Sequence, residues 1–420
     1  MSRGRVAVVG AGVSGLTAAH LLSRAHDVVL FEGEDRLGGH AHTHDVRTGD
    51  GRTIAVDSGF IVHNERTYPQ LLRLFGELGV LTRDTEMSLS VRCRGCGLEY
   101  AGAKRLRGLF PHPRNAGDLR YLRTLSQVPR FHRQAAELLD RPGDDQRTLA
   151  EFLADGGYSR HFAEHFAIPV VSAVWSAGPD TSGRYPARYL FEFLRHHGML
   201  SISGSPTWRT VVGGSREYVR RIADGLHAVR TATPVRSVRR LDDRVEVRSA
   251  DDAVHEFDRV VVATHADQAL RLLAEPTAAQ RRALGAFAYS ENATLLHTDG
   301  SVLPSRRGAR ASWNYLKNEC AGDSGGARIS YDMNRLMGLS EPADHVVTLN
   351  GDAEVDPGTV LAKMSYRHPI YTPESVAAQA DLPSIGDDRL RFAGAYHGWG
   401  FHEDGCLSGV RAAAALGSRW

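Results

Sequence analysis

A glycine-rich loop near the amino terminus constrains this chain more than any other feature. The loop, Gly10-Ala-Gly12-Val-Ser-Gly15, lies between an apolar run at residues 6–9 and a helical pattern at residues 16–22. In a strand, turn and helix of this kind, Gly10 makes the tight turn and Gly12 lets the backbone approach a pyrophosphate. Gly15 lets the helix pack closely on the strand, and the helix amino terminus holds the phosphates.

A second apolar run, at residues 28–31, ends at Glu32. This is the distance at which an acidic side chain accepts hydrogen bonds from ribose hydroxyls. Ser14, inside the loop, joins the glycines as a candidate phosphate contact. The combination predicts a dinucleotide-binding βαβ unit; the alternative is a glycine-rich turn that binds no ligand.

The segment after Glu32 separates NAD from FAD. It continues with Arg36, the pair Gly38-Gly39, His40 and Thr43. This spacing resembles the E-x-x-x-R-x-G-G-R-x-x-[ST] signature of the flavin-containing amine oxidase superfamily, in which the segment runs under the FAD. His40 departs from the arginine of that signature, so a hydrogen bond from histidine would replace contact with a fixed cation.

Later segments also resemble that superfamily, in its order. The resemblance implies that Val235 contacts adenine through its backbone and that residues 260–264 form a buried strand. The segment 390–395 resembles the closing F-A-G-E motif, with Gly394 beside the flavin and Ala395 in place of the acid. The carboxylate contact to the ribityl chain that this acid makes in the superfamily is therefore either absent here or made by Asp404 or Glu403.

One bacterial branch of predicted NAD/FAD-binding proteins is more similar still. The shared motifs are residues 59–69, which include Phe60 and Ile61 as expected cofactor contacts, and residues 312–315, 368–371 and 400–405. Related flavoproteins include methylene-fatty-acid desaturases and a linoleate isomerase. The resemblance thus implies FAD and a fatty acyl substrate, which composition alone does not show.

The fold class implied is α/β, with a Rossmann-like FAD-binding domain of the glutathione-reductase-like, amine oxidase type and a discontinuous α+β substrate domain. We expect the FAD-binding domain to comprise residues 1–85, 205–285 and 385–420. The substrate-binding domain would comprise residues 86–204 and 286–384. A capping box at Thr148, and a helix from Pro186 to His197 with Gly198 beyond it, support a mostly helical stretch before residue 204.

The lysine inventory bears on the chemistry. Amine oxidases of the superfamily commonly place a lysine near flavin N5, but this chain has only Lys104, Lys317 and Lys363. The resemblance places Asn292 at that position. Loss of the lysine favours oxidation at carbon over amine oxidation, although some relatives manage without it.

Removing a hydride from carbon also requires a base for the neighbouring proton. Candidate bases are His402, Glu403 and His63, and each could instead make a structural hydrogen bond. Candidate substrate contacts are Asn64, Tyr68, Trp313 and Phe401.

We therefore expect an FAD-dependent oxidoreductase that abstracts a hydride from an apolar substrate, a fatty acyl or lipid chain, giving desaturation or double-bond isomerisation. The alternatives are a flavin amine oxidase and a non-catalytic flavin-bound scaffold. FAD should be noncovalent, because no cysteine or histidine matches a tether position of the family.

Two short motifs are typical of metal sites. Cys93-x-x-Cys96 has no second cysteine pair to complete a structural zinc site, so we interpret it as a reduced turn between strands. His161-x-x-Glu164-His165 fits the inverted zinc-protease pattern but has no evident third ligand at helical spacing. From the sequence we expect no metal site.

Charge and hydropathy limit the partners. Lys and Arg number 51 against 49 Asp and Glu, a net charge of +2, which offers no global attraction to nucleic acid. The longest uncharged run, residues 166–179, is shorter than the roughly 18 to 20 residues of a membrane span and is expected to be buried. With a first strand starting near Arg5 there is no room for a signal peptide, so we expect a cytoplasmic protein; oligomeric state stays open.

Overall fold

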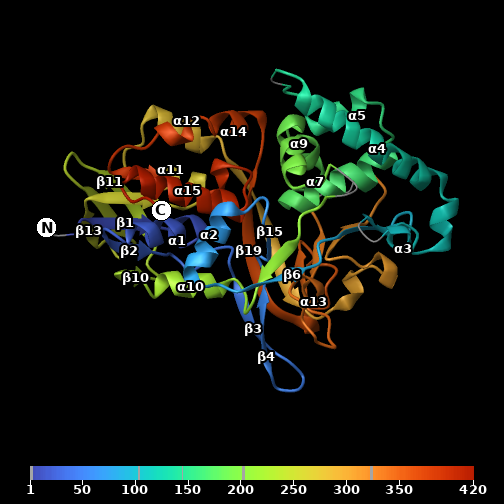
Figure 1. Ribbon diagram of the computed structural model, residues 1–420, viewed down its shortest axis with the longest axis horizontal. Helices are drawn as coiled ribbons and strands as arrows, with labels where there is room; N and C mark the ends of the chain where they lie inside the picture. Colours follow the sequence, from blue (N-terminus) through green and yellow to red (C-terminus); the bar gives the residue numbers. More distant parts are fainter. Residues whose placement is uncertain (1–2, 103–104, 144, 201–203, 322–324) are drawn as a thin grey trace.

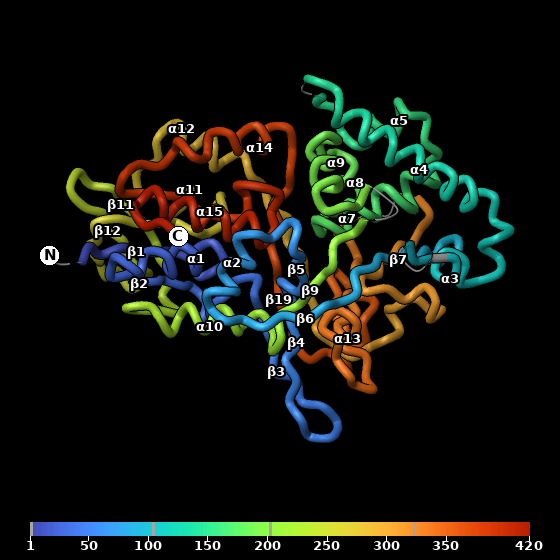
Figure 2. The backbone as a smooth tube through the Cα atoms, viewed as in Figure 1, coloured from blue at the N-terminus to red at the C-terminus, as the bar shows by residue number. Residues whose placement is uncertain are grey.

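The computed structural model has two lobes (Figure 1). It describes residues 3–102, 105–143, 145–200, 204–321 and 325–420. One lobe contains both termini and the glycine-rich loop, and the other combines a helical layer with a large sheet (Figures 1 and 2). Among the residues described, no helix has the length and apolar character needed to cross a membrane.

A parallel five-stranded sheet forms the centre of the first lobe, in the order β10-β2-β1-β14-β20. Alternate residues of β1 point into different cores, Val6 and Val8 into one and Ala7 and Val9 into the other, so both faces are covered, as parallel sheets require. The strands are β1 (Arg5–Val9), β2 (Asp27–Phe31), β10 (Ala228–Arg230), β14 (Arg259–Val262) and β20 (Leu390–Phe392).

Helices cover this sheet on both faces. On one face lie α1 (Val13–Leu22), α2 (Pro69–Leu78), α10 (Arg216–Ala223) and α15 (His402–Ala415). On the other face lie α11 (Ala266–Leu272) and α12 (Ala278–Gly285).

Helices α1 and α15 touch at two glycines of α15. A Cβ atom on Gly405 would lie 2.6 Å from Cγ1 of Val13, and one on Gly409 would overlap the carbonyl oxygen of Ser14. The two helix backbones therefore approach more closely than any larger side chain would allow. This contact joins the last helix of the chain to the first.

The second lobe is built on a mixed seven-stranded sheet, in the order β19-β15-β18-β17-β16-β7-β8. Only the β16–β7 pair is parallel. The long pair β15–β19 runs from the first lobe into this sheet (Figure 1). The strands are β7 (Leu89–Cys93), β8 (Glu99–Ala101), β15 (Ala288–His297), β16 (Trp313–Lys317), β17 (Ile329–Asp332), β18 (Val346–Leu349) and β19 (Val360–Ile370).

The helical layer confirms the expected caps. Thr148 and Glu151 form the predicted capping box, and Gly198, at φ 70°, follows the predicted helix. The uncharged run contains a mostly buried helix, as expected. The elements are α3 (Arg105–Leu109), α4 (Leu119–Asp140), α5 (Leu149–Asp155), α6 (Arg160–Phe162), the π-helical turn η3 (Ala163–Ala167), α7 (Ile168–Trp175), α8 (Pro179–Gly183) and α9 (Ala187–His196).

Three small sheets complete the fold. The buried strand expected over residues 260–264 is present as β14, although it ends at Val262. Asp258, whose carboxylate accepts a hydrogen bond from the Arg5 amide at 2.7 Å, separates it from β13, which joins a different sheet. The strands are β3 (Thr43–Arg47) with β4 (Thr53–Asp57); β5 (Val62–Asn64), β9 (Trp208–Val211) and β6 (Thr82–Thr85); and β11 (Val235–Arg240), β12 (Val245–Ser249) and β13 (Val254–Phe257). The exact domain boundaries stay a prediction.

Candidate functional site

The carboxyl ends of four parallel strands bring distant residues to one edge. Val9 is in register with Phe31 and Val262, and Val262 is in register with Phe392. The residues that follow these strands, including Gly10, Glu32 and Gly394, therefore meet at the same edge of the sheet. In open α/β folds, this is the edge at which nucleotides bind.

The glycine-rich loop and the Gly38-Gly39 pair lie against each other. The amide of Gly38 donates to the carbonyl of Ala11 at 2.9 Å, and a Cβ on Gly39 would lie 3.2 Å from Cα of Gly12. A Cβ on Gly12, by contrast, would meet nothing within 4 Å. Gly12 thus borders open space at the start of α1, as the predicted approach of a pyrophosphate to its backbone requires.

Gly10 and Gly15 have the packing roles expected of them. Gly10 has φ 101°, and a Cβ there would lie 2.7 Å from the carbonyl oxygen of Ala263. A Cβ on Gly15 would overlap the carbonyl oxygen of Gly10. Ser14 is buried in the first turn of α1, and Gly394 donates its amide to the hydroxyl of Ser408 at 2.9 Å.

Glu32 lies beside the β11–β12 hairpin, which begins at Val235, the predicted adenine contact; we call it the adenine-side hairpin. Its carboxylate accepts hydrogen bonds from the amides of Ala11, at 2.8 Å, and Glu34, at 3.0 Å. Its carbonyl accepts one from Thr233 at 2.8 Å, two residues before Val235 at the bulged start of β11. The structure therefore brings the predicted ribose acid and the predicted adenine contact together.

The side chain of Arg36 contacts the neighbouring loop residues Gly39 and Glu34. Its guanidinium donates to the carbonyl of Gly39 at 2.8 Å and pairs with Glu34 at 2.9 Å. His40 lies four residues further along the chain, where the family signature has an arginine. Burial and the charge of Arg36 lower the pKa of His40 to about 4, so its ring does not supply the positive charge of that arginine. The His40 ring is neutral at pH 7, and its Nε2 is buried with no hydrogen-bond partner.

Neutral imidazoles gather around His40. The ring centroids of His265 and His368 lie 6.2 Å and 5.3 Å from that of His40, and the ring of Tyr366 lies 5.0 Å from it. Burial lowers the pKa of both His265 and His368 to about 3. Sequence reasoning missed His265 and Tyr366; the available signals were a histidine directly after the buried strand and a tyrosine two residues before the His368 motif.

Asn292 is connected to this cluster. Its side-chain amide donates to Nδ1 of His368 at 3.1 Å and to Oγ of Ser290 at 3.2 Å, and its oxygen accepts from Asn350 at 2.8 Å. Of the lysines that the structure describes, Lys317 pairs with Glu164 at 3.0 Å and Lys363 is exposed on β19. Neither lies in the hydrogen-bond network of Asn292.

The Gly59–Ile61 turn ties the histidine cluster to α15. The amide of Phe60 donates to the carbonyl of His40 at 2.7 Å, and the Phe60 ring stacks on His402 at 3.8 Å. The carbonyl of Ile61 accepts from the Thr210 hydroxyl at 2.9 Å. Burial, with His40 and His63 nearby, holds the pKa of His402 well below its usual range, so this ring is also neutral.

The two carboxylates after His402 are engaged by backbone amides. Glu403 accepts from Gln70 and Leu71, each at 3.0 Å, and so caps the start of α2. Burial raises the pKa of Glu403 to about 7, although these amides oppose the shift. Asp404 caps its own helix by accepting from Phe401 at 2.9 Å, and burial raises its pKa to about 6.

His63 is fully buried and neither ring nitrogen has a partner. Burial lowers its pKa to about 4, and Phe75 packs edge-on against it at 5.3 Å. Asn64 instead closes a turn, accepting from the amides of Arg66 and Thr67 at 3.0 Å and 2.9 Å. Tyr68 is buried at the start of α2.

Aromatic side chains from the helical layer surround the loop before α15. Phe401 stacks on Phe193 at 4.8 Å, and Trp175 lies 6.3 Å from Phe401. The indole of Trp175 donates to the carbonyl of Trp399 at 3.0 Å, which fixes α7 to this loop. Of the predicted substrate contacts, Phe401 therefore meets the helical layer, as does Tyr68, whose ring lies 6.4 Å from that of His197 at the end of α9.

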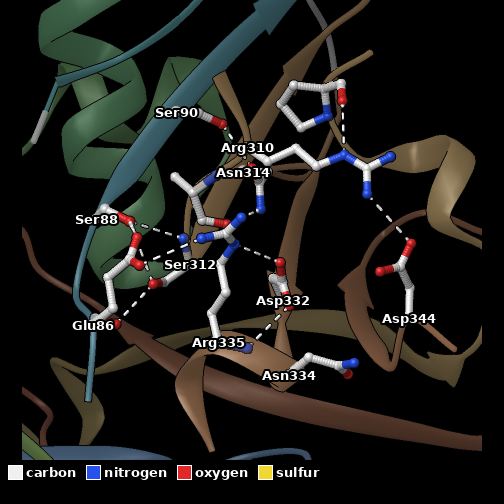
Figure 3. Close-up of polar contacts among 12 residues, drawn as sticks. Glu86, Ser88, Ser90, Arg310, Ser312, Asn314, Asp332, Asn334, Arg335 and Asp344 are labelled. Carbon is white, nitrogen blue, oxygen red and sulfur yellow. Dashed lines mark hydrogen bonds and ion pairs between the residues drawn. The ribbon is translucent and has the colours of Figure 1, made fainter. Parts of the chain in front are cut away.

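Trp313 and its motif lie in a different core. Trp313 packs edge-on against Tyr331 at 5.4 Å, on the seven-stranded sheet. The neighbouring polar residues connect strands: the hydroxyl of Ser90 on β7 donates to the amide oxygen of Asn314 at 2.8 Å (Figure 3). Asn314 in turn donates to the carbonyls of Ala311 at 2.7 Å and Ser330 at 3.0 Å. The motif at residues 312–315 therefore maintains the sheet.

The family profile described as flavin containing amine oxidoreductase matches residues 13–356. The chain belongs to this family. Amine oxidase A from dog is 25% identical over 270 residues, covering 61% of this chain and 49% of its own length, so the chain spans about half of that curated relative.

Two solved structures with the same fold superpose on almost the whole chain. Cyclohexylamine oxidase from Brevibacterium oxydans superposes with a TM-score of 0.69 and 18% identity over 99% of this chain and 98% of that one. A fatty acid isomerase from P. acnes superposes with a TM-score of 0.69 and 16% identity, over 97% of this chain and 98% of the isomerase chain. These likenesses confirm the predicted fold class.

Gly12→Ala tests the open space at the loop. We expect the purified variant to hold at least about tenfold less flavin, because the new methyl group projects where a pyrophosphate approaches. Its flavin-free stability should fall by no more than about 1 kcal/mol, the cost of alanine at the N-cap of α1, since the Cβ meets no protein atom within 4 Å. Absorbance measures flavin content and urea denaturation measures stability; Gly76→Ala, on an exposed part of α2, is the matched control. Full flavin content in Gly12→Ala would contradict this assignment.

His63 predicts a pH dependence of stability. Its pKa falls from 6.5 to about 4 on folding, so the unfolded chain binds the proton first as pH falls below 6.5. The flavin-free protein should lose about 2 kcal/mol between about pH 7.5 and pH 5 through this residue alone. Urea denaturation of His63→Leu should show a pH dependence smaller by that amount, and equal dependences would mean that His63 is charged or hydrated when folded.

Proposed function

We propose that this protein is an FAD-dependent oxidoreductase that abstracts a hydride from a C–H bond of an apolar substrate, in preference to an amine. The substrate class we favour is a fatty acyl or lipid chain, with desaturation or double-bond isomerisation as the outcome. The observation that carries this proposal is Asn292, which stands in the expected place of the lysine and is hydrogen-bonded to neutral His368.

The residues at the sheet edge support FAD as the cofactor. Gly12 borders open space, Glu32 lies beside the adenine-side hairpin, and His40 presents a buried nitrogen without a partner. When bound, FAD supplies a two-electron hydride acceptor. We propose noncovalent binding, since Cys406 is buried against Thr17 and the three other cysteines gather in the second lobe.

The charge state of the site favours an uncharged substrate. His40, His368 and His402 all have lowered pKa values because burial disfavours their charged forms. Glu403 already accepts two backbone hydrogen bonds. A neutral site of this kind offers no ready counter-ion for a cationic substrate.

Amine oxidation is the second candidate. The aromatic side chains of Trp175, Phe193, Trp399 and Phe401 around the loop before α15 favour it, because such rings pack against an amine substrate beside the flavin. The family description and the dog relative also favour it.

Anaerobic reduction distinguishes these functions. Fatty acids and a lipid extract should bleach the flavin absorbance of the wild-type protein, or exchange substrate hydrogen with solvent deuterium if the reaction is an isomerisation. An amine library should do neither. Bleaching by an amine alone would overturn the proposal in favour of amine oxidation, and no response to any substrate would favour a scaffold.

Asn292→Ala tests the observation behind the proposal. We expect flavin reduction by the active substrate to slow by about 100-fold, a typical effect of removing one aligned hydrogen-bonding group, with flavin content retained. Asn314→Ala is the matched control, because it also removes a buried amide from the same sheet, but away from the histidine cluster. It should lower stability without slowing reduction. Equal rates in both variants would contradict a role for Asn292.

A further inference from the structure

Four sulfur and nitrogen ligands meet at one point in the second lobe. The ligand atoms of Cys93, Cys96, His165 and Cys320 all lie within 4.8 Å of one another. They belong to the two motifs that sequence analysis leaves incomplete, joined by a cysteine that neither motif contains. None of the four takes part in the proposed flavin site.

The distances fit a tetrahedral metal centre. Zinc–sulfur bonds of about 2.3 Å and zinc–nitrogen bonds of about 2.0 Å place two sulfurs about 3.8 Å apart, and a sulfur and a nitrogen about 3.5 Å apart. The Sγ atoms of Cys93 and Cys320 are 3.8 Å apart, and Sγ of Cys96 is 3.7 Å from Nε2 of His165. All four cysteines of the chain are free thiols.

The chain is shaped around this point. Gly97, at φ 70°, reverses the backbone after Cys96 and returns it to β8, while the amide of Cys93 donates to the carbonyl of Leu98 at 2.8 Å. A Cβ on Gly95 would lie 2.9 Å from the amide nitrogen of Cys320. Glycine at this position lets the turn after β16 come close enough to add the third thiol.

His165 is oriented as a metal ligand. It lies in the π-helical turn η3, and such turns occur often at functional sites. Its Nδ1 lies 3.2 Å from the carbonyl of His161. Donation of the Nδ1 proton to that oxygen leaves the lone pair on Nε2, which faces Cys96, and this is how metal-binding histidines are usually fixed.

Glu164 does not compete for the metal. Its carboxylate pairs with Lys317, whose side chain is fully buried and lies in register with Cys93 on the adjacent strand. His161 instead contacts the hydroxyl of Thr124 through Nδ1 at 2.8 Å. His161 also stacks on His165 at 4.0 Å and lies beside Cys96, but His165 is the residue of the motif whose ring nitrogen joins the three sulfurs in one group of ligand atoms.

We propose that one zinc ion binds in a closed tetrahedral site formed by Cys93, Cys96, His165 and Cys320. Three thiolates and one imidazole are a ligand set of structural zinc and leave no open position for water. The ion ties the β7–β8 turn and the turn after β16 to the helical layer. Since α7 begins three residues after His165 and Trp175 at its end holds the loop before α15, the site also sets the position of the substrate-side helices.

Metal analysis of the full-length protein tests this proposal independently of catalysis. The wild type, purified under reducing conditions from zinc-supplemented medium, should contain one zinc per chain by plasma mass spectrometry. Cys96→Ser and Cys320→Ser should contain at least tenfold less. The matched control, Cys406→Ser in the other lobe, should keep a full equivalent of zinc.

Cobalt substitution gives the geometry. Protein loaded with Co²⁺ in place of zinc should show the ligand-field bands of tetrahedral cobalt thiolate, at wavelengths longer than flavin absorption. These bands should be absent from Cys96→Ser and weaker in His165→Gln. Octahedral cobalt spectra would overturn the assignment.

Chelation covers the case in which the serine variants fail to fold. Removing zinc from the wild type should lower its melting temperature, and adding zinc back should restore it, with flavin content unchanged. A reduced wild type that neither holds nor takes up zinc overturns the proposal. So does a disulfide between Cys93 and Cys320 in protein prepared with reductant, which would indicate a thiol pair instead of a metal site.

Discussion

The close contact between α1 and α15 holds the first lobe together. The sheet takes its strands from the beginning, middle and end of the chain, and the register of β1 with β2 and β14 brings their carboxyl ends to one edge. Gly405 and Gly409 let the last helix lie directly on the first, so the residues before α15 are fixed relative to the glycine-rich loop. Without that contact, His402 and the loop before it would have no defined position against His40.

Local patterns in the sequence predicted the parts of the site that depend on local structure. Strand, glycine turn, helix and acid are consecutive, so the placement of Gly12 and Glu32 followed from spacing. The histidine cluster could not be predicted in this way, because His265 reaches His40 from the end of β14 and His368 reaches it through the packing of β19 on the first lobe. The engagement of Glu403 by the first amides of α2 is likewise a tertiary contact between residues more than 330 positions apart.

The cysteine cluster illustrates the same limit. The turn at Cys93 and Cys96 was predicted correctly between two strands, but its partners lie far along the chain: His165 is 69 residues after Cys96, and Cys320 is 227 residues after Cys93. The parallel pairing of β16 with β7 brings the turn after Lys317 to the turn after Cys93. Spacing rules for zinc motifs detect ligands that are near in sequence. Here two of the four ligands come from the turn after β16 and from η3, which reach the Cys93–Cys96 turn only through tertiary packing.

The β15–β19 ladder restricts how the two lobes can move. At one end, Tyr289 accepts a hydrogen bond from the Ala266 amide of the first lobe at 2.9 Å; at the other, residues 294–297 pair with β18 in the second sheet. A rigid rotation of one lobe against the other would shear this ladder along its length, at a cost of about 1 kcal/mol for each hydrogen bond broken. The helices α7 and α9 are joined to the loop before α15 by one hydrogen bond each, from Trp175 and Tyr189, and by aromatic packing on Trp399 and Phe401. A local displacement of those helices therefore breaks fewer hydrogen bonds than a rotation of one lobe against the other.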